Sequence, residues 1–297
     1  RVTDIYYKGD VKGWSELLCH ENFHGYDISY NLYIQGELAD ELVIPETVTN
    51  IENFAFSGII SLTSVEFLSS DIQIGQNAFA GCASLRLVCG GVASVGNYAF
   101  DNCTALEEVK LSSEELLAVE GFAFRGCTAL ESLFLPQSVQ VIGERAFEGC
   151  SSLLALDLPE SLVEIGTYAF SNCLNVRSLT IHEKVEKIGL NAFSGMEALA
   201  ELNFNATRCN DFAVGNGIFD KAGTGGAGVA VTIGANVEYI PAFFLDPHAY
   251  SMTDHTNDTN ITSIVFAPGN VCTEIGNNAF AYCRVTEVIL PDTVTKT

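Results

Sequence analysis

The most reactive side chains in this sequence belong to ten cysteines and five histidines. No two cysteines are spaced Cys-x-x-Cys, the pattern at which a pair of thiolates commonly holds zinc, so we predict no zinc site. The sequence also contains no P-loop, His-Glu-x-x-His motif or Gly-x-Ser-x-Gly nucleophile elbow. Cysteines at a recurring position are Cys82, Cys103, Cys127, Cys150, Cys173 and Cys283, and the others are Cys19, Cys89, Cys209 and Cys272.

Two short segments could supply a nucleophile or a metal ligand. Near the N-terminus Cys19, His20 and His24 lie close together, but no sequence context places an Asp or Asn beside them, so we favour a packing role. Residues 246–260 collect Asp, His and Tyr side chains in one polar insertion. Oxygen-rich loops can bind Ca²⁺ and long loops often carry recognition, yet the spacing is irregular, and we expect a solvated excursion.

One glycine string resembles a dinucleotide-binding fingerprint. Gly223-x-Gly225-x-x-Gly228 matches Gly-x-Gly-x-x-Gly, which must follow a strand and open a helix to cradle a pyrophosphate. Here the string precedes the strand-like run 229–233. We therefore interpret it as a flexible corner and predict no cofactor.

The elements that position the side chains described above come from a sequence repeat of 21 to 24 residues. The dipeptide Ala-Phe recurs with nearly constant spacing, and degenerate copies fill the distance to the last one. Its phenylalanines are Phe56, Phe79, Phe100, Phe124, Phe147, Phe170, Phe193 and Phe280.

Each repeat predicts one coil of a solenoid. Leu-x-x-Leu-x-Leu alternates as a half-buried strand does, and a Val-x-x-Ile-Gly stretch then crosses the coil. Ala-Phe-x-x-Cys, with apolar residues three apart, is typical of a single helical or 3₁₀ turn. Because each coil contacts only its neighbours, its apolar face can be buried only by stacking.

The recurring cysteine position accepts other apolar residues, since Ile59 and Met196 occupy it in two copies. A position that accepts Cys, Ile and Met is a small buried slot. Five consecutive copies carry Cys, and five cannot all pair. We therefore predict buried thiols and no disulfides here.

Composition restricts the partners. The 297 residues include 37 acidic and 14 basic side chains, a net charge of −23, which disfavours nucleic acid and anionic lipid. Mean hydropathy is +0.24, although no stretch approaches the roughly 18 apolar residues of a spanning helix. Solenoid packing accounts for this dispersed apolar content.

The motif Leu-Pro-x-x-Val-x-x-Ile-Gly-x-x-Ala-Phe-x-x-Cys-x-x-Leu closely resembles the BspA-like leucine-rich repeats, over roughly residues 31–297. The segment 5–9 with Trp14 also resembles an element that recurs beside such repeats. The resemblance implies a right-handed horseshoe or curved rod used for adhesion or recognition at a cell surface. Its motif residues are structural, not catalytic.

The resulting domain prediction is an N-terminal flanking segment, 1–30, packing on the first coil, and a solenoid of about ten to eleven coils over 31–297 with an insertion at 246–260. The fold class is an α/β repeat solenoid with stacked parallel strands. The chain begins at Arg1 and ends partway through a coil, so we expect it to be a processed or truncated piece of a longer protein.

The open face of the strands is the predicted ligand-binding surface. In each strand the residues flanking the middle apolar one should point outward, in a series that ends at Glu287 and Ile289. A bland sheet surface is the alternative, and the convex side and the insertion are other candidate sites. The residues we select are Glu108, Lys110, Ser132, Phe134, Asp157, Thr180, Glu201 and Asn203.

We accordingly predict a non-catalytic, extracellular or cell-surface recognition or adhesion module. Its expected ligand is a protein or glycan, with a host molecule as one candidate, and it is expected to be a monomer that neither binds nucleic acid nor inserts into a membrane. The alternative is a structural spacer that projects another domain from the cell surface.

Overall fold

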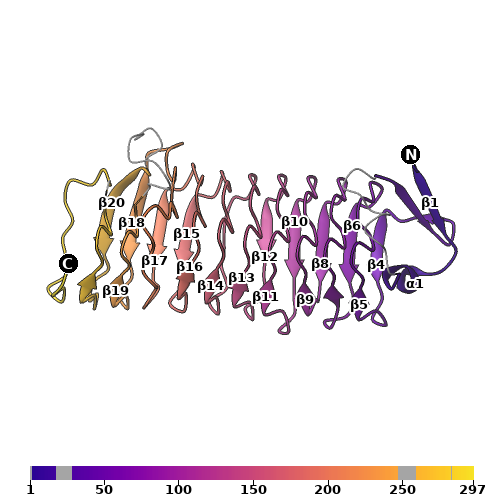
Figure 1. Cartoon of the computed structure of the whole chain (residues 1–297), viewed down its shortest axis with the longest axis horizontal. Coiled ribbons are helices and arrows are strands. Elements are labelled where there is room, and N and C mark those ends of the chain that lie inside the picture. The colour runs from indigo at the N-terminus through magenta and orange to yellow at the C-terminus, as the bar shows by residue number, and fades with distance from the viewer. Residues whose placement is uncertain (1, 18–28, 247–258, 282) are drawn as a thin grey trace. The chain divides into compact units, whose positions relative to one another are not determined.

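The computed structural model describes residues 2–17, 29–246, 259–281 and 283–297 (Figure 1). The chain divides into two compact units. Unit 1 comprises Arg1–Val139 and Ala146–Ser152, and unit 2 comprises Gln140–Arg145 and Leu153–Thr297.

Unit 1 is built on a sheet of five parallel strands, one from each successive repeat. The middle residue of each strand is buried, whereas its two neighbours are exposed or half-buried, as the period-2 alternation predicts. The predicted stacked parallel strands are therefore confirmed. The five are β4 (Glu41–Ile44), β6 (Ser64–Phe67), β8 (Leu87–Gly90), β10 (Glu108–Leu111) and β12 (Ser132–Phe134).

A second, narrower ladder runs through the Ile-Gly part of the unit 1 repeats. Its two-residue strands are β5 (Asn50–Ile51), β7 (Gln73–Ile74), β9 (Ser94–Val95) and β11 (Ala118–Val119). Where a glycine follows, after β7 and β9, close approach of the backbones requires it. A Cβ on Gly75 would lie 2.7 Å from the Ile51 carbonyl oxygen of the preceding coil, nearer than real side chains come.

Unit 2 repeats this arrangement with longer and less regular coils. Its wide sheet has four parallel strands, β15 (Ser178–Ile181), β17 (Glu201–Phe204), β18 (Val229–Ile233) and β20 (Ile261–Phe266). Its narrow strands are β13 (Val141–Ile142), β14 (Glu164–Ile165), β16 (Lys187–Ile188), β19 (Tyr239–Ile240) and β21 (Glu274–Ile275).

The Ala-Phe dipeptides form a third wall of stacked turns. In unit 1 the Phe79 and Phe100 rings lie 5.1 Å apart, centroid to centroid, with planes 3° apart, and Phe100 and Phe124 lie 5.0 Å apart. The backbone follows the same spacing, because the Phe79 N–H donates to the Ala99 carbonyl at 2.8 Å. In unit 2, Phe170 stacks on Phe193 at 5.8 Å.

The single helical or 3₁₀ turn predicted here is not confirmed, because the Ala-Phe segments are turns. Two residues per coil adopt left-handed backbone angles that interrupt a helix, for example Asn77 (φ 55°) and Gly81 (φ 72°). The Phe N–H also bonds to the next coil instead of to a carbonyl three or four residues earlier. In the described residues the one helix is α1 (Val11–Ser15).

The recurring cysteine slot is buried, as predicted, in the five consecutive copies from Cys82 to Cys173, whereas Cys283 in the last copy is half-buried. Cys82, Cys103 and Cys127 are fully buried, and so are Ile59 and Met196 at the same position of other coils. The described cysteines are present as thiols. Each thiol also has a polar role, since the Cys103 Sγ donates to the Phe79 carbonyl of the preceding coil at 3.2 Å, and Cys82 contacts the Phe56 carbonyl in the same way at 3.1 Å. The slot therefore favours a small side chain that can donate.

The N-terminal residues add a separate three-stranded sheet and α1. The sheet has the order β1 (Asp4–Tyr7), β2 (Asn31–Ile34) and β3 (Glu37–Leu38). Trp14 of α1 is buried, and its Nε1 donates to the Ala55 carbonyl at 2.7 Å. The Asp10 side chain caps α1 by accepting a hydrogen bond from the Gly13 N–H at 2.8 Å. Trp14 thus joins α1 to the coil that carries Phe56.

The expected domain boundary at residue 30 and the count of ten to eleven coils stay predictions. Most of the insertion at 246–260 lies outside the described residues, as do Cys19, His20 and His24. Asp246, at the start of the insertion, is buried.

Replacing Phe147 by Ala should lower the free energy of unfolding by about 3–5 kcal/mol, because it removes a fully buried ring that stacks on Phe124. His182→Ala is the control, since the side chain is only half-buried and the Val185 N–H bonds to its backbone carbonyl, which the substitution keeps. Urea denaturation of the two variants measures the difference. Equal destabilisation would contradict the assignment of inward and outward positions.

The thiols should react with iodoacetamide according to their burial. Burial raises the pKa of Cys82 to about 12 and that of Cys103 well above its usual value, so both stay protonated and unreactive at about pH 8. Cys89 is half-buried, and although burial also raises its pKa, it should be alkylated first. Mass spectrometry of native protein measures the order, and urea-unfolded protein, in which all should react alike, is the control. Equal native rates would show that the slot opens.

Candidate functional site

The open face of the unit 1 sheet carries two rows of outward side chains. Strand pairing places Glu108 beside Ser132 and Lys110 beside Phe134, so these four selected residues lie together. Phe134 is 57% exposed and is the largest exposed apolar side chain of the two rows. The rows read Glu41, Ser64, Leu87, Glu108, Ser132 and Val43, Glu66, Cys89, Lys110, Phe134.

Two of the charges on this face form an exposed ion pair. The Lys110 Nζ lies 2.8 Å from the Glu108 Oε1, and both groups are partly exposed. Exposed pairs of this kind contribute at most about 1 kcal/mol, so the pair can exchange partners when a ligand arrives. Cys89 lies next to Lys110, and its raised pKa makes it a poor nucleophile. The face can therefore offer apolar contact, hydrogen bonds and one cation.

The open face of unit 2 carries the other four selected residues. Strand pairing places Thr180 beside Asn203, while Glu201 lies in the neighbouring row beside Ser178. Asp157 is exposed and follows Leu156, which forms an isolated bridge with Leu179. Apart from Asp157, Glu201 and Val265, this face consists of small and neutral side chains. The rows read Ser178, Glu201, Ala230, Ser263 and Thr180, Asn203, Thr232, Val265.

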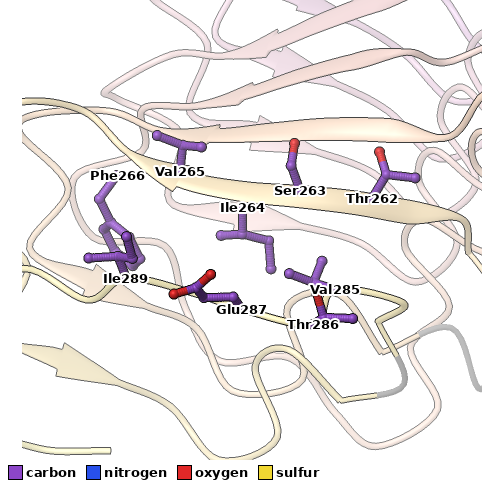
Figure 2. Close-up of a pocket in the computed structure, with 9 residues that line it drawn as sticks. All are labelled: Thr262, Ser263, Ile264, Val265, Phe266, Val285, Thr286, Glu287 and Ile289. Atoms are coloured by element: carbon purple, nitrogen blue, oxygen red, sulfur yellow. The ribbon is translucent and has the colours of Figure 1, made fainter.

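An apolar groove of about 450 Å³ borders the last strand of this face (Figure 2). One side is β20, with Ile264, Val265 and Phe266, and the other side is the segment that contains Val285 and Ile289. The sequence predicted that this segment forms the next strand. That prediction is wrong: residues 284–290 form no strand, and Ile289 is 77% exposed. Nothing in the described residues shows what covers the groove.

A polar recess of about 360 Å³ lies in unit 2, where residues 208–211 replace the regular narrow strand between β16 and β19. The Asp211 carboxylate accepts hydrogen bonds from the Tyr239 hydroxyl and, at 2.9 Å, from the Ala242 N–H. The Tyr239 hydrogen bond lowers the pKa of Asp211, and burial raises that of Tyr239 to about 12. Arg208 pairs with Glu238 at 3.0 Å. The departure from the repeat is visible in the sequence as the Gly-rich stretch 205–228.

Arg125 and Asp101 form an ion pair at the turn wall of unit 1 that the sequence analysis missed. Arg125 donates to both carboxylate oxygens, at 2.7 and 2.8 Å, and Asp101 is 2% exposed. The guanidinium also lies over the Tyr98 and Phe122 rings, 5.5 and 5.1 Å from their centroids. Because two of its N–H groups bond to Asp101 and its flat face lies over two rings, we assign Arg125 a structural role.

Of the remaining candidate motifs, the glycine string lies fully within the described residues. Gly223–Gly228 forms turns that lead directly into β18, so it precedes a strand as predicted. In the part of the chain that the structure describes, no group of three His, Cys, Asp or Glu side chains could hold a metal ion. Over the same residues, no helix is both long and apolar enough to cross a bilayer.

Comparison with solved structures gives the fold independently. A leucine-rich repeat protein from Bacteroides ovatus aligns over 86% of this chain and 67% of its own, with 21% identity and a TM-score of 0.54. A leucine-rich repeat protein from T. pallidum aligns over 63% of this chain and 78% of its own (26% identity, TM-score 0.46). A leucine-rich cell surface protein from Faecalibacterium prausnitzii aligns over 86% and 76% (18% identity, TM-score 0.40). The comparison with curated proteins gave no match.

The model of the BspA-type leucine-rich repeat region matches six copies, in residues 27–127, 117–222 and 252–297. These ranges include the wide and the narrow strands of both units except β18 and β19. The repeat inferred from the Ala-Phe spacing and the stacked parallel coils agree with that match. The chain belongs to the BspA-type leucine-rich repeat family.

Proposed function

We propose that this protein is a non-catalytic recognition or adhesion module that binds a protein or glycan through the open strand faces. One observation carries the proposal: the outward side chains of the parallel strands take no part in the core. Each is fixed on a rigid, hydrogen-bonded backbone, so the face presents a constant pattern of groups. Rigid presentation lowers the entropy lost when a partner binds.

In unit 1 the strongest candidate contacts are Phe134 and its neighbours Lys110, Glu108 and Ser132. An exposed phenylalanine can bury a large apolar area in a partner, and aromatic residues dominate the energetics of many interfaces. Lys110 supplies a cation in an otherwise acidic protein. This combination suits a partner surface with an apolar centre and an acceptor-rich edge.

In unit 2 the proposed contacts are Asp157, Thr180, Glu201 and Asn203. Their hydroxyl, amide and carboxylate groups can hydrogen-bond to a peptide backbone or to sugar hydroxyls. They offer little apolar area. Contacts made here would add specificity more than affinity.

The proposed location is extracellular or at the cell surface, which follows from the family resemblance, with a host molecule as one candidate ligand. The net charge of −23 supports the exclusion of nucleic acid and anionic lipid. The monomeric state, the absence of a cofactor and the right-handed horseshoe or curved rod are part of the same proposal.

A structural spacer is the second candidate, and the blandness of the unit 2 face favours it. A spacer needs only a stiff stack of coils, which the Phe and Cys ladders supply. The two candidates differ in one measurable respect: a spacer has no ligand whose affinity depends on outward strand residues.

The test is a screen of the intact chain against glycan arrays and extracellular-matrix proteins, followed by variants of the face. Phe134→Ala should weaken binding about tenfold or more, the effect expected from losing an interface anchor. Leu117→Ala is the matched control, because Leu117 is 53% exposed in the same unit but lies outside the two rows. Affinities from biolayer interferometry measure the effect, and thermal melts check folding.

Two outcomes would contradict the recognition function at this face. The first is a ligand whose affinity is unchanged by Phe134→Ala, Lys110→Ala and Asn203→Ala. The second is the absence of any ligand in the screen, which would favour the spacer.

A further inference from the structure

A stacked pair of tyrosines, one exposed and one half-buried, lies on the N-terminal sheet, which is separate from the sheets that carry the open strand faces. The Tyr6 and Tyr33 rings stack with centroids 4.5 Å apart and planes 17° apart. Tyr6 is 69% exposed, and Leu38, opposite Tyr33 on β3, is 40% exposed. β1 is the outer strand of its sheet, and among the described residues no strand pairs with it on the side away from β2.

The core does not explain this exposure. Tyr7, the next residue, points to the opposite face and makes an edge-on contact with the buried Trp14 at 5.3 Å. Tyr7 thus joins β1 to the packed interior, together with Leu32, which is fully buried. The Tyr6 ring is left as an apolar surface in water, and its stacking on Tyr33 makes this face of the sheet aromatic.

A carboxylate and an amide lie beside the tyrosines on the same face. Asp4 and Asn31 are paired across β1 and β2, two residues before Tyr6 and Tyr33, so all four side chains share one side of the sheet. The Asn31 Nδ2 donates to the Asp4 Oδ1 at 3.0 Å, and the Thr3 hydroxyl donates to the Asp4 Oδ2 at 2.8 Å. The amide carbonyl of Asn31 and the second N–H of its Nδ2 remain for a ligand.

We propose that Asp4, Tyr6, Asn31 and Tyr33 form a binding site for a neutral saccharide. A sugar ring has an apolar C–H face that can lie on the outer face of Tyr6, and hydroxyls that both donate and accept hydrogen bonds. The polar pair lies about 6.6 Å from the tyrosine pair along the strands, within reach of hydroxyls of the same or the adjoining sugar unit. Asp4 and the net charge of −23 disfavour anionic saccharides.

The proposal is tested with the full chain and three neutral probes, maltotriose, cellotriose and triacetylchitotriose, at up to about 10 mM by saturation-transfer NMR. At least one probe should bind. Tyr6→Ala should weaken it by about 2- to 12-fold, the range expected for losing one aromatic contact, and Asp4→Ala should weaken it further. Tyr6→Trp should retain binding, because it keeps an aromatic face.

Phe134→Ala is the control, since it removes an equally exposed ring from the open face and should leave this binding unchanged. A heparin-derived tetrasaccharide should bind less well than the neutral probes. The proposal is overturned if no neutral probe binds, if Tyr6→Ala has no effect, or if the anionic probe is preferred. A saccharide whose binding is lost in Phe134→Ala but kept in Tyr6→Ala would instead support the open face and overturn this site.

Discussion

The wide strands, the narrow strands and the Ala-Phe turns of successive coils must all be stacked at the same spacing. The rest of the structure depends on this constraint. Parallel strands fix the step at about 4.8 Å, and the stacked rings of Phe79 and Phe100 follow it at 5.1 Å. Gly75 has no side chain because the backbone of the previous coil lies too close. The buried thiol of Cys103 fits between the turns of successive coils and donates to the carbonyl of Phe79. The repeated residues are therefore those that a shared step requires.

The same constraint determines which residues are available for binding. Side chains that point into the coil pack in the core between neighbouring coils, whereas outward residues such as Phe134 and Lys110 do not. Departures from the repeat act differently. Where residues 208–211 interrupt the narrow ladder, Asp211 must bond to Tyr239 and Ala242 instead of to a regular neighbour, and a recess opens. Outward rows and irregular segments are thus the places in the stack where side chains are not required by the repeat.

The strands could be predicted from sequence because period-2 alternation is a local property, and the buried Val109 between Glu108 and Lys110 shows it directly. The turn at Ala-Phe could not be predicted in this way, because the spacing of its apolar residues also fits a helix. Hydrogen bonds to the next coil and the left-handed angle at Asn77 decided the outcome. The prediction of a strand around Ile289 was wrong for a related reason. The alternating pattern there matches a strand, but a strand also needs a neighbouring backbone to pair with in register, and this segment does not pair with β20.

By itself the sequence determined the family, the stacked coils and the inward positions. Each repeat places apolar residues at the same positions, so every copy indicates the same packing. Only the tertiary structure decided which outward groups become neighbours. Tyr6 and Tyr33 are far apart in the chain, and the pairing of β1 with β2 brings their rings into contact. Asp211 and Tyr239 meet across coils in the same way. Such contacts depend on where an irregular segment lies in space, which a periodic pattern does not encode.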